Sequence, residues 1–161
     1  RSGRFYSAFG LYTDTDGYYH YEDVFAYGFK LGAQIMMEVL KMRDLQVELA
    51  VNGREALEMF RDHPENYYDA ILMDVRMPEM DGLEATAAIR KLDRDDAKKV
   101  PIIALTANAF DEDVQRSLQV GMNAHLSKPI NPDHLYQTLE EMIWAAENRK
   151  CLFPEYNKKR L

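Results

Sequence analysis

Three polar residues of this chain each stand at the end of a predicted β-strand and have complementary chemistry. They are Asp74, Thr106 and Lys128. A carboxylate can attack a phosphoryl group, a hydroxyl can donate a hydrogen bond to a phosphoryl oxygen, and an ammonium can neutralise phosphate charge. Any one of them has an ordinary explanation, as a cap at a strand end or as a surface side chain. The three at successive strand ends, in this order, indicate phosphoryl chemistry.

Side chains so far apart in the sequence can meet if the strands before them are parallel, with their carboxyl ends at one edge of a sheet. The residue pattern predicts strands over residues 47–51, 68–73, 100–105 and 124–127. Stretches with a helical apolar period alternate with them, over residues 29–42, 54–62, 83–92, 111–120 and 132–143. Parallel strands need such helical crossovers, so the sequence predicts an α/β fold whose sheet is covered by helices on both faces.

The composition agrees with one folded domain and excludes several classes of protein. The chain has 161 residues, of which 47% are apolar, and this is enough for a core. The net charge of −7 argues against binding to nucleic acid or to an anionic membrane surface. A single cysteine, Cys151, excludes an intrachain disulfide and suits a cytoplasmic protein. No apolar run approaches the roughly 18 residues that a membrane span needs.

Three stretches carry a resemblance to the receiver domains of response regulators. The phosphoacceptor signature of that CheY-like family resembles residues 71–82, ILMDVRMPEMDG. Its fourth strand resembles residues 101–109, PIIALTANA, and its fifth resembles residues 121–130, GMNAHLSKPI. Among receiver domains, those attached to hybrid sensor histidine kinases have the residue pattern that is most similar to these stretches. The resemblance implies a flavodoxin-like, doubly wound parallel sheet with strand order 2-1-3-4-5.

The resemblance also implies a role for each residue of the site. Asp74 would take a phosphoryl group from a phosphohistidine of a histidine kinase or of a histidine phosphotransfer protein. Thr106 would be the switch hydroxyl, and Lys128 would bind the phosphate. His125 takes the position of a rotating aromatic switch, although a half-buried strand histidine is its ordinary explanation. The elements within residues 111–143 would form the face that binds a downstream protein.

Structural and metal-binding roles follow from the same resemblance. Gly82 would have a structural role, and the peptide bond before Pro129 is expected to be cis. The Asp74 carboxylate and the backbone carbonyl of Arg76 would be ligands of Mg²⁺, which prefers oxygen donors in octahedral geometry. Receivers complete this site with two adjacent acidic residues at the end of their first strand.

This acidic pair is the part of the pattern that the chain does not match. Counting back without gaps from Asn52 and Gly53 places the pair at Tyr27 and Gly28, and neither has a carboxylate. We therefore expect an atypical or missing first strand. Residues 1–30 also hold 10 of the 18 aromatic side chains, which makes them unlike the rest of the chain.

Three explanations of the first strand remain open. A strand over residues 18–21 would make Glu22 and Asp23 the acidic pair and metal ligands. A strand over residues 9–12 would use Asp14 or Asp16, in the turn that follows it, and would need a longer insertion. In the third, the usual strand is replaced, and a segment within residues 5–11 pairs into the gap, because the neighbouring strands would otherwise have unpaired backbone groups.

The expected organisation is an atypical aromatic-rich segment over residues 1–29, a receiver domain over residues 30–145 and a basic tail over residues 146–161. Five basic and two acidic side chains lie in the last 15 residues. Either a free-standing regulator or a part of a hybrid histidine kinase fits this organisation.

Two functions fit the resemblance. The first is a phosphoacceptor in a two-component phosphorelay, which modifies itself and is not an enzyme for free substrates. The second is a receiver-like interaction module that is not phosphorylated, because the acidic pair that binds Mg²⁺ is absent. An aspartate-based phosphohydrolase is disfavoured, because such an enzyme needs a second aspartate two residues after Asp74, where this chain has Arg76.

Overall fold

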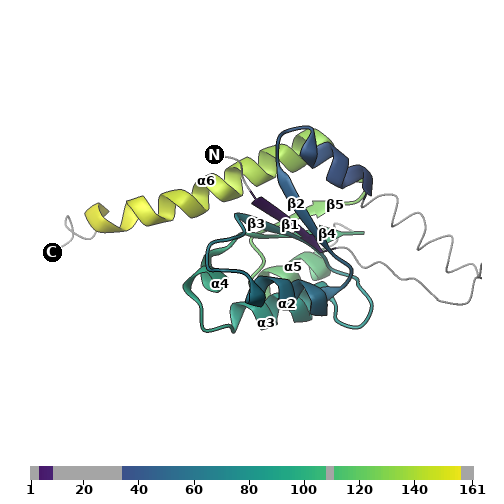
Figure 1. Ribbon diagram of the computed structural model, residues 1–161, viewed down its shortest axis with the longest axis horizontal. Coiled ribbons are helices and arrows are strands. Elements are labelled where there is room, and N and C mark those ends of the chain that lie inside the picture. Colours follow the sequence, from purple (N-terminus) through teal and green to yellow (C-terminus); the bar gives the residue numbers. More distant parts are fainter. Residues whose placement is uncertain (1–3, 9–33, 108–110, 157–161) are drawn as a thin grey trace, which may run out of the picture.

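The arrangement of the elements is shown in Figure 1, in which the computed structural model describes residues 4–8, 34–107 and 111–156. Residues 4–8, 111–113 and 149–156 are described by their backbone only. The strands are β1 (Arg4–Ala8), β2 (Gln46–Ala50), β3 (Ala70–Asp74), β4 (Ile102–Thr106) and β5 (Ala124–Ser127). A helix over residues 34–41 precedes α2 (Gly53–Asp62), α3 (Gly82–Arg90), α4 (Asp95–Lys99), α5 (Asp111–Gln119) and α6 (Pro132–Tyr156).

The described strands form one parallel sheet in the order β2-β1-β3-β4-β5. The predicted flavodoxin-like fold is therefore confirmed. In Figure 1, α6 and the helix over residues 34–41 lie on one face of the sheet, and α2, α3, α4 and α5 lie on the other. Helices on both faces bury β3 and β4 along their whole length, which explains the nearly continuous apolar sequences of these two strands.

The strand β3 divides the core into two layers. Its side chains are buried along its whole length and alternate between the two faces of the sheet. Leu72 packs in the cluster that contains Leu135 of α6, whereas Ile71 and Met73 pack in the cluster that contains Phe60 of α2. The apolar residues before Asp74 pack on both faces of the sheet and so fix the position of Asp74 at the end of the strand.

The centre of the sheet is filled by β1. This strand pairs in parallel with β2, where Ala8 lies opposite Ala50, and with β3, where Ala8 lies opposite Met73. The hypothesis that a segment within residues 5–11 pairs into the gap is therefore confirmed. The predicted boundary at residue 30 does not separate the sheet from the segment before it, because β1 belongs to that segment.

The central position of the sheet is taken by β1, so neither of the other two proposed strands, over residues 18–21 and over residues 9–12, is needed to fill it. The first strand is also not missing. Hydrogen bonding explains this outcome: β2 and β3 each present a row of backbone groups that one strand between them can satisfy. Residues 9–33, which include Glu22 and Asp23, lie outside the described residues.

Two helices differ from the sequence-based expectation. The short helix α4 was not predicted, because its five residues show no apolar period; acidic residues begin it and basic residues end it, as suits the helix dipole. The last helix, α6, continues to Tyr156 and so enters the predicted basic tail. No helix in the described part of the chain is long and apolar enough to cross a membrane.

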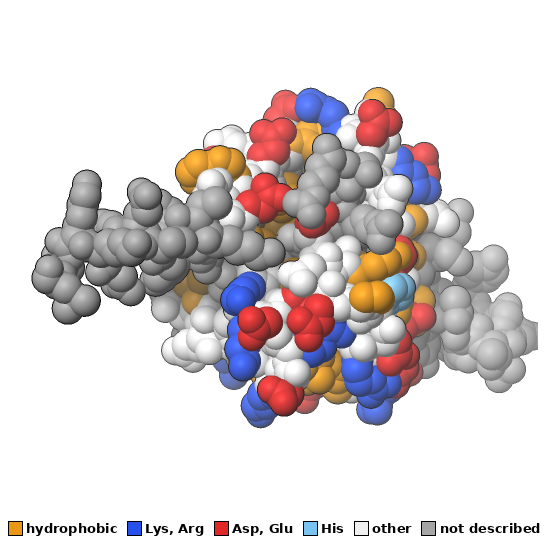
Figure 2. Space-filling model, turned by 60° about the vertical axis from the view of Figure 1, so that its left-hand side comes forward, with side chains coloured by type: hydrophobic (Ala, Val, Ile, Leu, Met, Phe, Trp, Pro, Cys, Tyr) orange, Lys and Arg blue, Asp and Glu red, His pale blue; other side chains and the backbone are white. Residues whose placement is uncertain are grey.

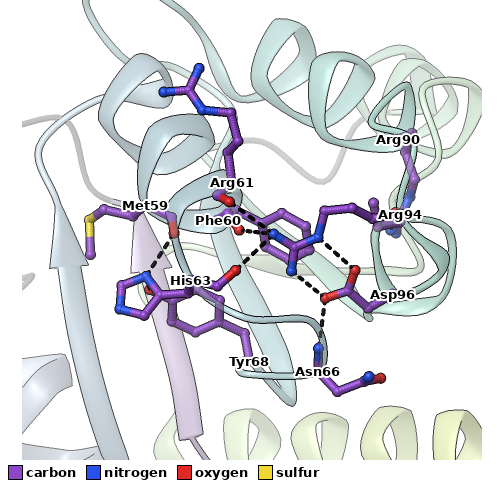
Figure 3. A network of polar contacts seen from close by, with 10 residues as sticks. Met59, Phe60, Arg61, His63, Asn66, Tyr68, Arg90, Arg94 and Asp96 are labelled. Carbon is purple, nitrogen blue, oxygen red and sulfur yellow. Dashed lines mark hydrogen bonds and ion pairs between the residues drawn. The ribbon is translucent and has the colours of Figure 1, made fainter.

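Arg94, in the loop between α3 and α4, ties several segments together (Figure 3). Its Nη1 donates hydrogen bonds to the backbone carbonyls of Phe60, Arg61 and His63, at distances of 2.8, 3.1 and 2.9 Å. These carbonyls belong to the end of α2, so the guanidinium caps that helix. Two further bonds reach Asp96, Nε to Oδ1 at 3.0 Å and Nη2 to Oδ2 at 2.8 Å.

The partner carboxylate, Asp96, is also buried, with 6% of its side chain exposed. Burial by itself would raise the pKa of this carboxyl, but the Arg94 guanidinium and the Asn66 N–H lower the pKa below its ordinary value. A carboxyl whose pKa is lowered by folding adds stability above its unfolded-state pKa. That stability is lost as the pH falls through the folded-state pKa.

We predict that Arg94→Ala lowers the free energy of unfolding by about 3–5 kcal/mol at neutral pH, because Asp96 would remain buried without its cation. Urea denaturation measures the change. The difference from the natural chain should shrink as the pH falls below about 4, where the Asp96 carboxyl is protonated in the unfolded chain. The matched control is Arg61→Ala, whose exposed pair with Asp62 is worth less than about 1 kcal/mol. Equal losses for both variants would contradict this account.

Deletion of residues 1–8 should abolish cooperative unfolding or lower the melting temperature by more than 10 °C, the effect of a loss above about 3 kcal/mol. Without β1, the backbone groups of β2 and β3 that face it have no partner. Deletion of residues 157–161 is the control and should leave the melting temperature nearly unchanged. Differential scanning calorimetry provides the measurement, and an unchanged transition after the first deletion would contradict the central placement of β1.

Candidate functional site

The three residues with complementary chemistry lie at the same edge of the sheet. Asp74 is the last residue of β3, Thr106 is the last residue of β4, and Lys128 follows the end of β5. The register aligns these ends, since Asp74 lies opposite Leu105 and Thr106 lies opposite Ser127. The N–H of Lys128 donates to the carbonyl of Thr106 at 2.8 Å, which continues the ladder between these strands.

Asp74 is a buried carboxylate with a cation beside it. It is 3% exposed, its Oδ2 is paired with Nζ of Lys128, and its Oδ1 accepts a hydrogen bond from the N–H of Arg76 at 3.0 Å. Burial raises the pKa of the Asp74 carboxyl, and the Lys128 ammonium and the Arg76 N–H counteract part of that rise. The pairing favours the ionised form, which is the form that can act as a nucleophile.

Thr106 has a buried hydroxyl whose Oγ1 has no hydrogen-bond partner among the described residues. An unsatisfied buried hydroxyl costs about 1–3 kcal/mol, so it is rare and needs an explanation. Thr86, inside α3, has the same property, so the missing partner does not by itself mark a site. What distinguishes Thr106 is its position, on the strand next to Asp74 and at the same edge of the sheet.

The loop after Asp74 is held close to that residue by Gly82. A Cβ atom at Gly82 would lie 2.0 Å from the backbone oxygen of Asp74, so any larger residue would push the two apart. The N–H of Gly82 donates to the carbonyl of Val75 at 3.1 Å. Asp81 caps α3 by accepting from the N–H of Glu84 at 2.8 Å, and the Glu84 carboxylate accepts from the N–H of Asp81. The turn therefore has a defined shape.

The remaining predicted residues lie around this edge. The peptide bond between Lys128 and Pro129 is cis. His125 is exposed on β5, opposite Ala104 of β4, and is not half-buried. Arg76 lies two residues after Asp74 and is exposed.

An open cleft of about 450 Å³ lies between the loop that follows Asp74 and α5. It is lined by Val75, Arg76, Met77, Pro78, Asp81, Leu83 and Arg116. Two guanidinium groups thus line the same cleft, and their positive charge favours an anionic ligand. Sequence analysis missed Arg116, because 40 positions separate it from Arg76 and no local pattern connects them.

Two of the predicted metal ligands, the Asp74 carboxylate and the Arg76 carbonyl, lie among the described residues. Carboxylate and carbonyl oxygens are hard donors, and Mg²⁺ keeps several waters, so Asp74 and the Arg76 carbonyl fit two of its positions. No group of three or more metal-ligating side chains is found in the part of the chain that the structure describes. Glu22 and Asp23, the predicted additional ligands, lie outside it.

Comparison with known proteins shows the family of this chain. The family model of the response regulator receiver domain matches residues 30–140. Hybrid signal transduction histidine kinase I of Dictyostelium discoideum is 34% identical over 132 residues, which are 80% of this chain and 8% of that protein. Hybrid signal transduction histidine kinase B of the same organism is 40% identical over 123 residues, which are 70% of this chain and 6% of that protein.

Solved structures give the same result. The receiver domain of the sensor histidine kinase PA1611 from Pseudomonas aeruginosa, with a magnesium ion in its active-site cleft, has a TM-score of 0.70 and is 29% identical; the match covers 89% of this chain and 98% of that one. The chemotaxis protein CheY4 of Vibrio cholerae has a TM-score of 0.68 at 27% identity, with 88% and 99% covered.

The fold, the site and these matches define a receiver domain of two-component signalling. The chain belongs to the response regulator receiver family. Its relatives include the receiver domains of hybrid histidine kinases, and the chain spans less than a tenth of the length of the two Dictyostelium kinases.

We predict that Gly82→Ala destabilises the fold by about 1–3 kcal/mol, because the new methyl group would overlap the backbone oxygen of Asp74. Chemical denaturation measures the loss. The matched control is Glu84→Ala in the same helix, which removes one cap contact and should cost less than about 1 kcal/mol. A Gly82→Ala variant as stable as the natural chain would contradict the close approach of this turn to Asp74.

Proposed function

We propose that this chain is the phosphoacceptor of a two-component phosphorelay and that Asp74 takes the phosphoryl group. One observation carries the proposal: a buried carboxylate paired with Lys128 lies at the same sheet edge as the unpartnered hydroxyl of Thr106. Membership of the receiver family supports it. The phosphodonor would be a phosphohistidine of a histidine kinase or of a histidine phosphotransfer protein.

The transfer requires one bond to form and one to break. An oxygen of the Asp74 carboxylate attacks phosphorus, and the P–N bond of the phosphohistidine breaks, so the donor imidazole leaves with the electron pair. The product is an acyl phosphate on Asp74. The Lys128 ammonium neutralises charge on the phosphoryl oxygens, and the Thr106 hydroxyl donates a hydrogen bond to one of them.

The cleft beside Asp74 would guide the anionic donor toward it. Arg76 and Arg116 line that cleft, and cations near a reaction site raise the local concentration of anions. The two guanidinium groups therefore oppose the repulsion between a carboxylate nucleophile and a phosphoryl group.

Magnesium is the cofactor that we propose for the transfer. The Asp74 carboxylate and the backbone carbonyl of Arg76 would hold it, together with Glu22 and Asp23 from the N-terminal segment. When bound, the ion supplies further neutralisation of charge on the transferring phosphoryl group.

Phosphorylation would change the molecule by adding a charge of about −1.5 to −2 at Asp74. We propose that the Thr106 hydroxyl moves toward the new phosphate and that His125 changes its orientation on β5 in response. The face made by the elements within residues 111–143 would then bind a downstream protein. His125 is exposed at the edge strand of the sheet, where such a partner can reach it.

A second candidate function is a receiver-like interaction module that is not phosphorylated. It is favoured by the absence of a group of metal-ligating side chains among the described residues. A poor metal site would slow the transfer by removing charge neutralisation at the transition state.

Intact-mass spectrometry with acetyl phosphate, with and without Mg²⁺, separates the two functions. The phosphoacceptor predicts a Mg²⁺-dependent gain of one phosphate that Asp74→Asn abolishes. Asp93→Asn, which changes an exposed carboxylate in the loop after α3, is the matched control and should be phosphorylated like the natural chain. No gain in a sample with a cooperative unfolding transition would support the interaction module.

The metal ligands can be tested in the same experiment. Glu22→Gln with Asp23→Asn should reduce Mg²⁺-dependent phosphorylation by at least about tenfold, because two carboxylate donors are lost. Asp14→Asn with Asp16→Asn is the comparison pair in the same segment and should have little effect. The opposite result would assign the metal site to Asp14 and Asp16.

A further inference from the structure

The outer surface of α6 has features that phosphoryl transfer does not use. Its inward side is buried through Leu135 and Leu139, which are 1% and 2% exposed. On the opposite side, Trp144 is 67% exposed, although tryptophan is among the largest apolar side chains. Figure 1 shows α6 running along the outside of the molecule and past the end of the sheet.

Acidic and amide side chains surround Trp144 on this outer surface. Helical spacing of three, four, seven or eight residues places side chains on one face. We call this face the α6 ridge, and it consists of Asp133, Gln137, Glu140, Glu141 and Trp144, all of which are exposed. Gln137 Nε2 donates to Glu141 Oε1 at 2.9 Å, so one carboxylate has an amide partner on the ridge itself.

The ridge is acidic without compensation in its own sequence. No lysine or arginine occurs between Lys128 and Arg149. Basic and acidic side chains are interspersed over much of the surface drawn in Figure 2. The stretch of α6 without a lysine or arginine is therefore a local property and not simply the average over the molecule.

We infer that the α6 ridge is a docking surface for a basic segment of a partner protein, with Trp144 at its centre. The indole face attracts an arginine or lysine side chain through a cation–π interaction, and the neighbouring carboxylates Glu140 and Glu141 can pair with further cations. Exposed tryptophans are enriched among the residues that dominate binding energy at protein interfaces.

Charge excludes the other simple occupants of this surface. A second copy docked ridge to ridge would bring carboxylates against carboxylates, and an anionic membrane or a nucleic acid would be repelled in the same way. The inference rests on the proposed partner-binding face within residues 111–143, whose partner it names by charge, and it does not require that Asp74 is phosphorylated. Binding at the ridge and phosphorylation are measured by separate readouts, so either can fail without the other.

Trp144 is the single tryptophan of the chain, so emission excited selectively from tryptophan comes from the ridge and makes the test direct. The probe is an amphipathic helical peptide with lysines on its polar face, and the control peptide has glutamates in their place. We expect a saturable change of Trp144 emission with the lysine peptide and none with the glutamate peptide. Glu140→Gln with Glu141→Gln should weaken binding about tenfold, as the loss of two charge pairs predicts.

Matched variants separate the ridge from the general negative charge of the chain. Glu58→Gln with Glu65→Gln removes two exposed carboxylates elsewhere and should change the affinity less than about twofold. Trp144→Ala, measured by calorimetry, should weaken binding at least as much as the ridge double variant. Equal losses in the two double variants, or no binding of the lysine peptide, would overturn the inference. Light scattering that finds a dimer abolished by Trp144→Ala would assign the surface to a second copy.

Discussion

A buried carboxylate sets the conditions for the rest of this structure. Asp74 is 3% exposed, and leaving its charge without partners would cost several kcal/mol. The cation that relieves this cost, Lys128, comes from the end of β5, two strands away in the sheet. The ends of β3, β4 and β5 must therefore lie at one edge. The same requirement brings Thr106, on the strand between them, beside the carboxylate.

Buried polar groups have complete hydrogen bonding at one place in this molecule and incomplete hydrogen bonding at another. Arg94 donates to the carbonyls at the end of α2 and to both oxygens of Asp96, which gives a rigid connection between α2 and α4. At the Asp74 edge, by contrast, the hydroxyl of Thr106 has no partner among the described residues. Stability is thus concentrated away from the site, and the site retains a donor that an incoming anion can use.

Charge is also sorted over the surface, although the chain as a whole carries −7. Guanidinium groups of Arg76 and Arg116 line the cleft between the loop after Asp74 and α5. The α6 ridge has carboxylates around Trp144 and belongs to the opposite layer from α5 (Figure 1). The two proposed binding surfaces therefore differ in charge and lie on opposite faces of the sheet.

The sequence alone was enough to predict Asp74, Thr106 and Lys128 as one site. Each ends a strand that short-range patterns reveal, and parallel strands bring such ends together. The central strand was a different problem, because β1 lies among many aromatic residues with no distinctive period and is selected by its pairing with β2 and β3. The cleft that Arg76 and Arg116 share could not be predicted from the sequence either. Local periodicity determines where elements form, whereas the tertiary structure decides which distant segments satisfy each other's hydrogen bonds and charges.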